Sequence, residues 1–599
     1  MGAHAETLRK GNASRGCLRW RSHMLPTFKS AEIPGTAFNR RYFLARLAGS
    51  GALLAIHNAA GAPIGGRAKN QAPHIINIYN FVRNSDPRTA NSEEYLFSAA
   101  THQLKLLRGL SLPCTFALQY DALINPRYQR LFKTHATALT EIGAWLEVPR
   151  ALVEKAGLSW RGPANWQWDW HVDVDFTVGY SPDERKRIAD VYMAEFKRLF
   201  GKFPATVGAW YIDEITLAHL AEHYGIAASC NCKDQAETDG YTLWGGYWSQ
   251  AYYPSRVNAY MPAQNRSAQI DVPIFRMLGS DPIYQYQENI GGDGQGVMTL
   301  EPCSPGGRSA RWVDWFFKVI TQGPCLAFAY AQAGQENSFG WPAMRKGLEY
   351  QFPMLARLAR AGVIQLETLE QSGRWFGKSF NVTPATAVVA LHDWKHQGRK
   401  TVWYDTRYFR VNLYWHGAEF KVRDIHLFNE KVRSPYHRQA DRTKDLAVYT
   451  LPVIDGLRDG PRSGIRLVGI DEKSVRVPLR MDGNPIVTAP GDSDLHIRFK
   501  IKEGGTMNIV CREDRLAFYW RRTSGSTLKW AMEMTWSAAR SAGVGRNTSD
   551  TLYYHKHGVN YALVLDQGTV VRPSGAARTI LFVPQQEAVI MAMESKLPM

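Results

Sequence analysis

Short apolar runs alternate with amphipathic stretches from about residue 75 to residue 370. Short runs rich in β-branched and aromatic residues are typical of buried strands, whereas an apolar period of 3.6 residues indicates helices. The predicted strands lie at 75–82, 114–121, 141–147, 207–213, 227–232, 272–278, 325–331 and 363–369, and the predicted helices at 92–110, 128–140, 181–200, 216–224, 308–321 and 345–361. This alternation predicts a parallel α/β architecture. Its length favours a barrel over an open sheet.

The pattern changes after residue 380. Runs such as KTVWYDTRYFRVNLYW (400–415) and LHIRFKI (495–501) alternate or are β-branched, with Gly, Asp and Pro turns between them. Such runs are typical of strands in a β-sandwich. We therefore expect an α/β barrel over residues 75–375 and a β-rich, sandwich-like region over residues 380–599.

The first 62 residues have the features of an export signal. Arg40 and Arg41 precede Tyr-Phe-Leu, and a weakly apolar run at 47–56 leads to the small residues at 60–62. The paired arginines resemble the twin-arginine signal of bacteria. The apolar run is shorter than the roughly 20 residues that span a bilayer. We expect a signal at 1–62, a linker at 63–74, no stable membrane insertion after signal removal, and a periplasmic or secreted protein.

The composition of the chain limits which classes of molecule it could bind. The formal charge of the 599 residues is +18, but the predicted signal holds nine Lys and Arg against two Glu, and the other cations are scattered. Nucleic-acid binding needs a clustered basic face, so we expect no nucleic-acid partner, whereas an acidic glycan stays compatible. The 19 Trp and 27 Tyr fit either a large core or a cleft that stacks sugar rings. Oligomeric state is left open.

Five predicted strands end in, or lead into, a carboxylate. The residues are Asp121, Glu147, Asp213, Asp281 and Glu336. In α/β barrels the chemistry lies at the carboxyl ends of the strands. Each acid could instead cap the next helix or pair with an arginine. Several acids on one face are what glycosidic bond cleavage needs, because one carboxylate must be ionised while another is protonated.

The stretch 181–235 resembles the NodB-type polysaccharide deacetylases and the family 57 and 38 glycoside hydrolases, on GKFPATVGAW (201–210) and LAHLAEHYGI (217–226). This resemblance implies a seven-stranded (β/α) barrel. Residues 208–213 are similar to the family 57 Gly-x-Trp-x-Pro-Glu motif, which implies Asp213 as nucleophile. Residues 335–341 resemble that family's strand-7 motif, which leaves Glu336 as the acid. Glu147 is the main rival for either role.

The metal motifs of the deacetylases are absent from the sequence. The first strand ends in Asn-Phe-Val-Arg instead of Asp-Asp, and Trp145 and Pro149 stand where the second motif has histidines. His171 and Asp173 resemble the His-x-Asp of family 38 but follow the third strand. We therefore expect no metal and no cofactor.

Aromatic residues in polar loops suggest where a sugar would bind. The loop 238–256 holds Trp244 and Trp248 among Gly and Tyr, and is either a cleft wall or a surface that docks onto the β-rich region. Arg276 could hold an acidic group of the substrate or a neighbouring carboxylate. The predicted substrate-binding residues are Asp121, Trp145, His171, Trp210, Trp244, Trp248, Arg276 and Asp281.

Together these features predict an exported glycoside hydrolase that acts on a poly- or oligosaccharide through two carboxylates. A non-catalytic carbohydrate-binding protein and a polysaccharide deacetylase are the alternatives. Glu214, next to Asp213, is better explained as favourable charge at a helix N-terminus than as the partner acid.

Overall fold

The computed structural model describes residues 72–238, 241–286, 298–523, 528–537 and 543–596. Residues 70–599 form one compact unit. The predicted signal and most of the predicted linker lie outside the described residues. Among the described helices, none is long and apolar enough to cross a membrane.

Seven parallel strands form the barrel sheet, in the order β12-β1-β2-β3-β4-β5-β11. They are β1 (His74–Val82), β2 (Cys114–Leu118), β3 (Thr140–Trp145), β4 (Thr206–Gly208), β5 (Ala228–Asn231), β11 (Ile274–Arg276) and β12 (Ala329–Ala333). β13 (Gln365–Glu367) also pairs with β1, and β8 (Ala251–Tyr252) runs antiparallel to β11. Every residue of β1 is buried, as in a parallel strand that is covered on both faces. The predicted seven-stranded barrel is confirmed.

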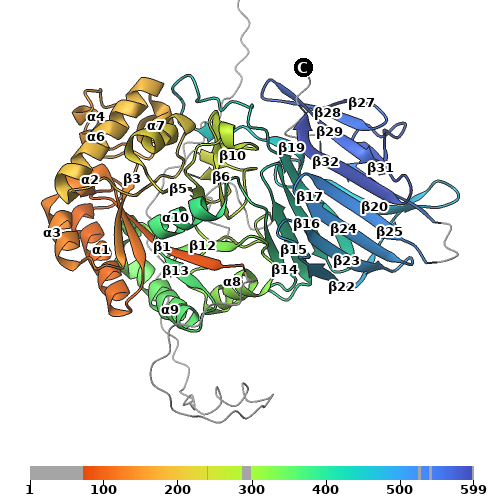
Figure 1. The fold of residues 1–599 in the computed structure, drawn as a ribbon, viewed down its shortest axis with the longest axis horizontal. Helices are drawn as coiled ribbons and strands as arrows, with labels where there is room; N and C mark the ends of the chain where they lie inside the picture. The colour runs from red at the N-terminus through yellow and green to blue at the C-terminus, as the bar shows by residue number, and fades with distance from the viewer. Residues whose placement is uncertain (1–71, 239–240, 287–297, 524–527, 538–542, 597–599) are drawn as a thin grey trace, which may run out of the picture. The chain divides into compact units, whose positions relative to one another are not determined.

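Helices follow these strands along the chain (Figure 1). They are α1 (Ser92–Gly109), α2 (Tyr120–Ile124), α3 (Pro126–His135), α4 (Arg150–Lys155), α5 (Val172–Asp175), α6 (Pro182–Phe200), α7 (Glu214–Tyr224), α8 (Ala310–Gln322), α9 (Gly340–Arg360) and α10 (Leu369–Ser379). The sequence sets the ends of α6: Ser181 and Glu184 form a capping box, and Gly201 ends the helix with φ 76°.

A side chain spans the gap between β11 and β12, which are not paired with each other in the described sheet. The Gln250 amide donates to the Tyr330 carbonyl oxygen at 3.4 Å and accepts from the Tyr330 N–H at 2.8 Å. The Gln250 carbonyl oxygen in turn accepts from the Arg276 N–H at 2.9 Å. Gln250 therefore links both edges of the barrel sheet.

Two antiparallel sheets make up most of the β-rich region, as predicted. The first contains β14 (Thr386–Ala390), β15 (Arg399–Asp405), β16 (Phe409–His416), β17 (Glu419–Leu427), β19 (Leu451–Asp455), β20 (Gly464–Ile470), β21 (Arg476–Pro478), β26 (Lys529–Thr535), β30 (Thr569–Val571) and β31 (Thr579–Val583). The second contains β22 (Met481–Thr488), β23 (Leu495–Ile501), β24 (Thr506–Arg512), β25 (Arg515–Arg521), β27 (Gly543–Asn547), β28 (Thr551–Lys556), β29 (Val559–Gln567) and β32 (Ala588–Lys596).

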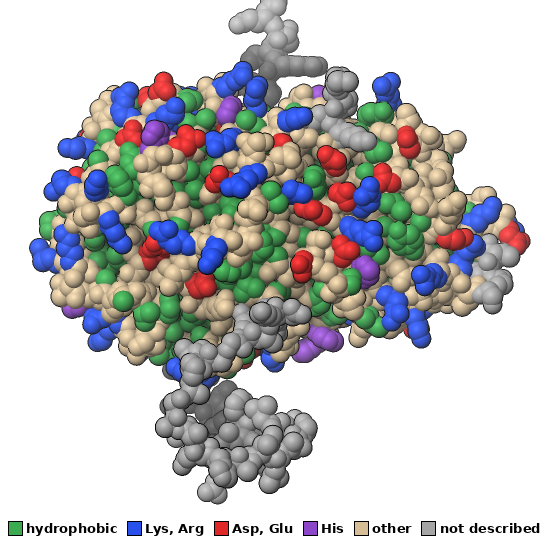
Figure 2. Space-filling model, in the orientation of Figure 1, with side chains coloured by type: hydrophobic (Ala, Val, Ile, Leu, Met, Phe, Trp, Pro, Cys, Tyr) green, Lys and Arg blue, Asp and Glu red, His purple; other side chains and the backbone are tan. Residues whose placement is uncertain are grey.

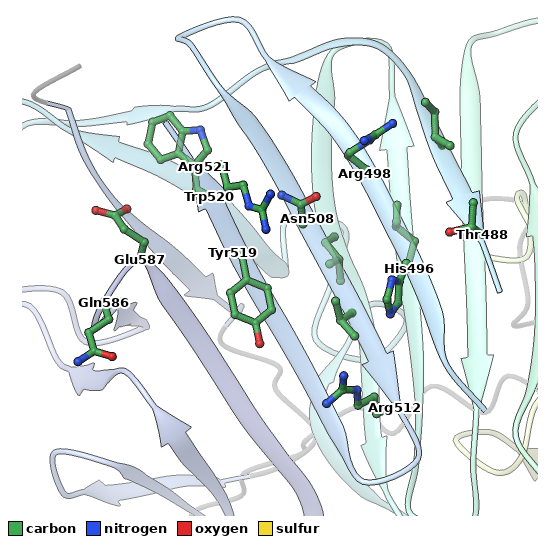
Figure 3. A pocket seen from close by; sticks show the side chains of 14 residues that line it. Thr488, His496, Arg498, Asn508, Arg512, Tyr519, Trp520, Arg521, Gln586 and Glu587 are labelled. Atoms are coloured by element: carbon green, nitrogen blue, oxygen red, sulfur yellow. The ribbon is translucent and has the colours of Figure 1, made fainter. Parts of the chain in front are cut away.

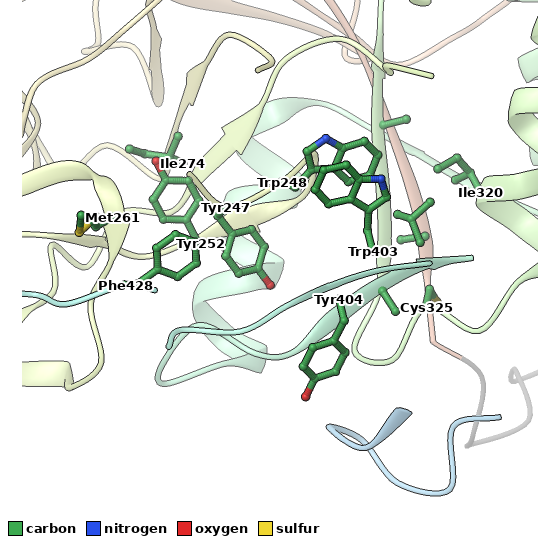
Figure 4. Packing of buried hydrophobic residues seen from close by; sticks show 14 of the residues in the cluster. Tyr247, Trp248, Tyr252, Met261, Ile274, Ile320, Cys325, Trp403, Tyr404 and Phe428 are labelled. Atoms are coloured by element: carbon green, nitrogen blue, oxygen red, sulfur yellow. The ribbon is translucent and has the colours of Figure 1, made fainter. Parts of the chain in front are cut away.

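The loop that carries Trp244 and Trp248 packs against the first of these sheets. The Trp248 ring stacks on Trp403 of β15 with centroids 4.3 Å apart (Figure 4). Tyr247 shares a hydrogen bond of 2.8 Å with the Thr386 hydroxyl of β14. Trp244 and Trp248 are each only 2% exposed, so neither has a free ring face for a sugar. This corrects the predicted cleft wall: the aromatic residues serve the packing between barrel and sheet.

Candidate active site

Arg83, the first residue after β1, joins two of the three predicted catalytic acids. Its Nε and Nη2 donate to the Glu147 carboxylate at 2.7 and 2.5 Å, and its Nη1 donates to Glu336 at 2.7 Å. Glu147 follows β3 and Glu336 follows β12, so strands on both sides of β1 contribute. The three residues are 1–4% exposed. The barrel thus brings Glu147 and Glu336 to a common guanidinium.

Glu147 accepts two further hydrogen bonds. Gln119 Nε2, after β2, donates at 2.5 Å, and Trp210 Nε1, after β4, donates at 2.8 Å. The four hydrogen bonds that this carboxylate accepts come from the Arg83, Gln119 and Trp210 side chains. An ionised carboxylate can accept this set in full, because its two oxygens offer about four acceptor positions.

Glu336 has a different setting. Burial raises its pKa to about 7, and the charge of Glu147 acts in the same direction, against the opposing effects of Arg83 and Arg88. Its hydrogen-bond contact with Arg83 uses a single nitrogen, whereas Glu147 takes two. A buried carboxyl with a pKa near 7 is suited to donate a proton at neutral pH.

Two more acids lie around this pair. Burial raises the pKa of Asp121 to about 7, although the Asn84 and Ala122 N–H groups donate to it. The pKa of Asp175 is raised well above its usual range by burial and by the charge of Glu147. Asp175 accepts from the Trp168 indole at 2.8 Å, and its second oxygen has no hydrogen-bond partner in the described structure. Crowded carboxyls of this kind take different protonation states.

Aromatic rings surround the cluster. Phe81 stacks on Trp145 at 4.1 Å and meets Trp210 edge-on at 5.0 Å. The Arg83 guanidinium lies 4.2 Å from the Trp168 ring centroid, a cation–π contact. Trp145 is fully buried, so it supports the site and does not present a face to a sugar as predicted. Trp210 is partly exposed beside Glu147, and its predicted contact with substrate stays a prediction.

Asp213, the predicted nucleophile, is instead the N-cap of α7. It accepts from the N–H groups of Ile215 and Thr216, from the Thr177 and Thr216 hydroxyls, and from Arg185 at 3.1 Å. It is completely buried. Burial alone would raise its pKa, but Arg185 and these donors hold the pKa below the usual range. The hydrogen bonds of Asp213 are all with these residues and none is with Arg83, so Asp213 does not join Glu147 and Glu336 at the shared guanidinium.

Asp281 and Arg276 are also held within the structure. Asp281 is fully buried and accepts from the Trp312 and Trp394 indoles at 2.9 Å, in place of sugar hydroxyls. Arg276 donates to Asp234 at 2.6 Å. Of the alternatives for Arg276, the neighbouring carboxylate is the one that the structure shows, and that carboxylate is Asp234.

His171 lies in the tryptophan-rich insertion. Its Nδ1 is 2.6 Å from Asp169 Oδ1, and its ring stacks on Trp170 at 5.2 Å. It remains partly exposed. Its predicted contact with substrate stays a prediction.

Sequence reasoning missed Arg83, Gln119 and Asp175 as members of the site. Arg83 follows an apolar strand without a break, and an arginine in that position needs an acid partner once it is buried. That signal was in the sequence. The partners of Gln119 and Asp175 depend on pairs that only the folded chain brings together.

A possible ligand set for a metal lies elsewhere. In the described part of the chain, Asp424 and His426 of β17 and Asp455 of β19 place their ligand atoms within 4.8 Å of one another. His426 Nε2 lies 3.6 and 3.5 Å from these two carboxylates. Arg410 donates to both oxygens of Asp424 and so already supplies that acid with a cation. This set belongs to the first antiparallel sheet and not to the ends of the barrel strands.

No protein-family model matches the chain. No curated protein matches it. Among solved structures, a Parabacteroides distasonis protein with a provisional assignment as glycoside hydrolase/deacetylase has a TM-score of 0.44 at 12% identity, over 63% of this chain and 88% of that one. A family 57 branching enzyme of Thermococcus kodakaraensis has a TM-score of 0.29 at 8% identity, over 50% and 70% of the chains.

A 4-alpha-glucanotransferase of Thermococcus litoralis has a TM-score of 0.29 at 10% identity, over 88% of this chain and 98% of that one. These neighbours include the enzyme classes that the sequence motifs resemble. Their TM-scores are below 0.5, so the function of this chain is argued from its own site.

Proposed function

We propose that the chain is a carbohydrate-active enzyme, specifically a glycoside hydrolase with Glu147 and Glu336 as its carboxylate pair. The observation that carries this proposal is the convergence of both acids on Arg83 at the carboxyl ends of the barrel strands. Barrel enzymes place their chemistry at these ends. The export signal at 1–62 stays part of the proposal and makes the enzyme periplasmic or secreted.

The two acids would have different roles in the reaction. Glu336, with its pKa raised to about 7, would donate a proton to the leaving glycosidic oxygen. Glu147, held by four donors, would act as the ionised carboxylate, either on the anomeric carbon or on a water. Arg83 orients both acids. The partly exposed Trp210 and the exposed Arg88 mark the side from which a sugar chain would approach.

The test is the release of reducing ends from a panel of bacterial and plant glycans. Glu147→Gln and Glu336→Gln should each lower turnover by roughly 10²–10⁴-fold while the protein stays folded. Glu154→Gln is a matched control, because Glu154 pairs with Arg150 at the exposed surface of α4. Wild-type protein that cleaves no glycan in the panel would contradict the proposal.

A non-catalytic carbohydrate-binding protein is the second candidate, and the burial of the pair favours it. Glu147 is 1% and Glu336 4% exposed, which leaves little access in this conformation. This candidate predicts glycan binding by the wild type with no turnover. It also predicts that Glu147→Gln changes affinity alone.

A further inference from the structure

The second antiparallel sheet has a groove of about 710 Å³ on one face. Cross-strand pairing places Ile486, Arg498, Asn508 and Tyr519 in one row over β22, β23, β24 and β25. Neighbours across antiparallel strands share a face. Figure 3 shows Arg498, Asn508, Tyr519 and Arg521 on this side of the strands. In β23 these positions alternate with the buried Ile497 and Phe499, so the groove faces away from the core.

The groove contains two arginines whose guanidinium groups have no acidic partner among the described residues. Arg498 and Arg521 are exposed, and neither side chain has a hydrogen bond or ion pair with another described residue. The other charged residues of the lining are paired: Arg512 lies 3.5 Å from Asp494, and Glu587 contacts Arg522. The groove therefore presents two guanidinium groups to a ligand with negative charge.

The remaining lining supplies polar and aromatic contacts. Asn508 lies between the two arginines and offers its acceptor oxygen and one amide N–H, since its amide nitrogen also donates to the Thr506 carbonyl oxygen at 3.4 Å. The partly exposed Tyr519 ring gives an apolar face with a polar tip. Arg498 and Tyr519 lie two strands apart, or roughly 9–10 Å at the usual strand spacing. A single small anion does not span this distance, whereas a chain of several units does.

We propose that this groove binds an acidic polysaccharide. Sugar carboxylates would lie on Arg498 and Arg521, because the planar guanidinium donates two parallel hydrogen bonds to a carboxylate. A sugar face would lie on Tyr519, and hydroxyls would bond to Asn508. The choice of a glycan among polyanions rests on the function proposed above, whereas the charge requirement rests on the groove alone.

The surface argues against a polynucleotide in the same place. Polynucleotides follow a continuous basic track, since affinity grows with each phosphate that is neutralised. The groove lining itself includes the acid Glu587, and on the face of the molecule shown in Figure 2 Lys and Arg side chains are interspersed with Asp and Glu. Two arginines around one tyrosine suit local recognition of carboxylates better than a long phosphate backbone.

Binding of polygalacturonate to the full chain tests the proposal. The Glu147→Gln variant is the host, so that turnover does not consume the ligand, and isothermal titration calorimetry gives Kd at two salt concentrations. Arg498→Ala should weaken binding at least about tenfold, since a hydrogen bond to a charged group contributes that much. The double variant Arg498→Ala/Arg521→Ala should lose most of the affinity.

Arg515→Ala is the matched control. Arg515 lies on β25 as Arg521 does, but it pairs with Asp566 and does not line the groove. Its loss changes the net charge equally and should leave Kd within about twofold of the host, as a surface substitution does. Fully methyl-esterified polygalacturonate, which lacks the carboxylates, should bind much more weakly than the acid form.

Alginate and hyaluronan widen the panel to other carboxylated chains. No binding to any of the three acidic polymers, or equal binding by the double variant, would overturn the proposal. Tighter binding of single-stranded DNA through the same two arginines would overturn it in favour of a polynucleotide. Hydrolysis by the wild type is measured separately, so groove binding without turnover and turnover without groove binding are distinct results.

Discussion

Gln250 uses its side-chain amide to bind both backbone polar groups of Tyr330. It takes the place of a paired strand at the gap between β11 and β12. A buried N–H that loses its partner costs about 1–3 kcal/mol. Gln250→Ala should therefore lower the free energy of unfolding by that amount in urea titrations monitored by circular dichroism.

Gln167→Ala is the control for this substitution, because Gln167 is exposed. Its unfolding free energy should lie within about 0.5 kcal/mol of wild type. Equal stability of the Gln250 and Gln167 variants would contradict the structural role of the amide.

Asp213 should matter for stability and not for chemistry. Asp213→Ala leaves Arg185 buried without its acid, and breaking a buried pair costs about 3–5 kcal/mol. Because the folded pKa of Asp213 is depressed, its contribution is present above the unfolded pKa and is lost as pH falls through the folded value. Thermal unfolding from pH 2 to 7 should show that the wild type loses more stability in acid than Asp213→Asn does.

The turnover number per folded molecule distinguishes this structural role of Asp213 from its predicted role as nucleophile. The folded fraction of Asp213→Asn should keep wild-type kcat within a few-fold. A loss of roughly 10²-fold or more in a folded variant would restore Asp213 to the catalytic pair. Asp183→Asn, at the exposed start of α6, serves as the control for both measurements.

Glu336 should make the protein less stable as pH rises toward neutrality. Its folded pKa of about 7 lies above the usual 4.5, so its stabilising contribution is complete in acid and is lost as pH rises through 7. The displacement corresponds to about 3 kcal/mol. The stability difference between Glu336→Gln and wild type should therefore shift in favour of the variant between pH 4 and 8, measured by chemical denaturation. A difference that is constant over this range would contradict the raised pKa.

Trp248→Ala should destabilise the protein through the packing of barrel on sheet. The ring is buried and stacked on Trp403, and a buried tryptophan reduced to alanine costs about 3–5 kcal/mol. Differential scanning calorimetry measures this loss. Trp166→Ala, at a partly exposed ring of the insertion, is the matched control and should cost much less. A folded Trp248 variant of wild-type stability with impaired glycan binding would instead support the cleft-wall interpretation.

The sequence predicted the barrel because its strands are apolar on both faces and its helices carry their own caps. The same regularity placed Glu147 and Glu336 at strand ends. The sequence could not decide the role of Asp213, because an N-cap and a nucleophile can both follow a strand. The contact with Arg185 of the preceding helix, which distinguishes the two roles, exists only in the folded chain. Trp248 presented the same difficulty, since an aromatic loop suits a sugar cleft and a buried contact equally well.

Arg83 gives the proposed acid and base a shared counter-ion. Proton uptake by Glu336 removes one of the two charges that this guanidinium balances and leaves its field to Glu147. The Arg83 charge lowers the pKa of Glu336 against the effect of burial, so the protonation state of the proposed acid depends on this one guanidinium. Substituting Arg83 with a neutral residue should therefore raise the pKa of Glu336 further and move the loss of activity that follows its deprotonation to higher pH.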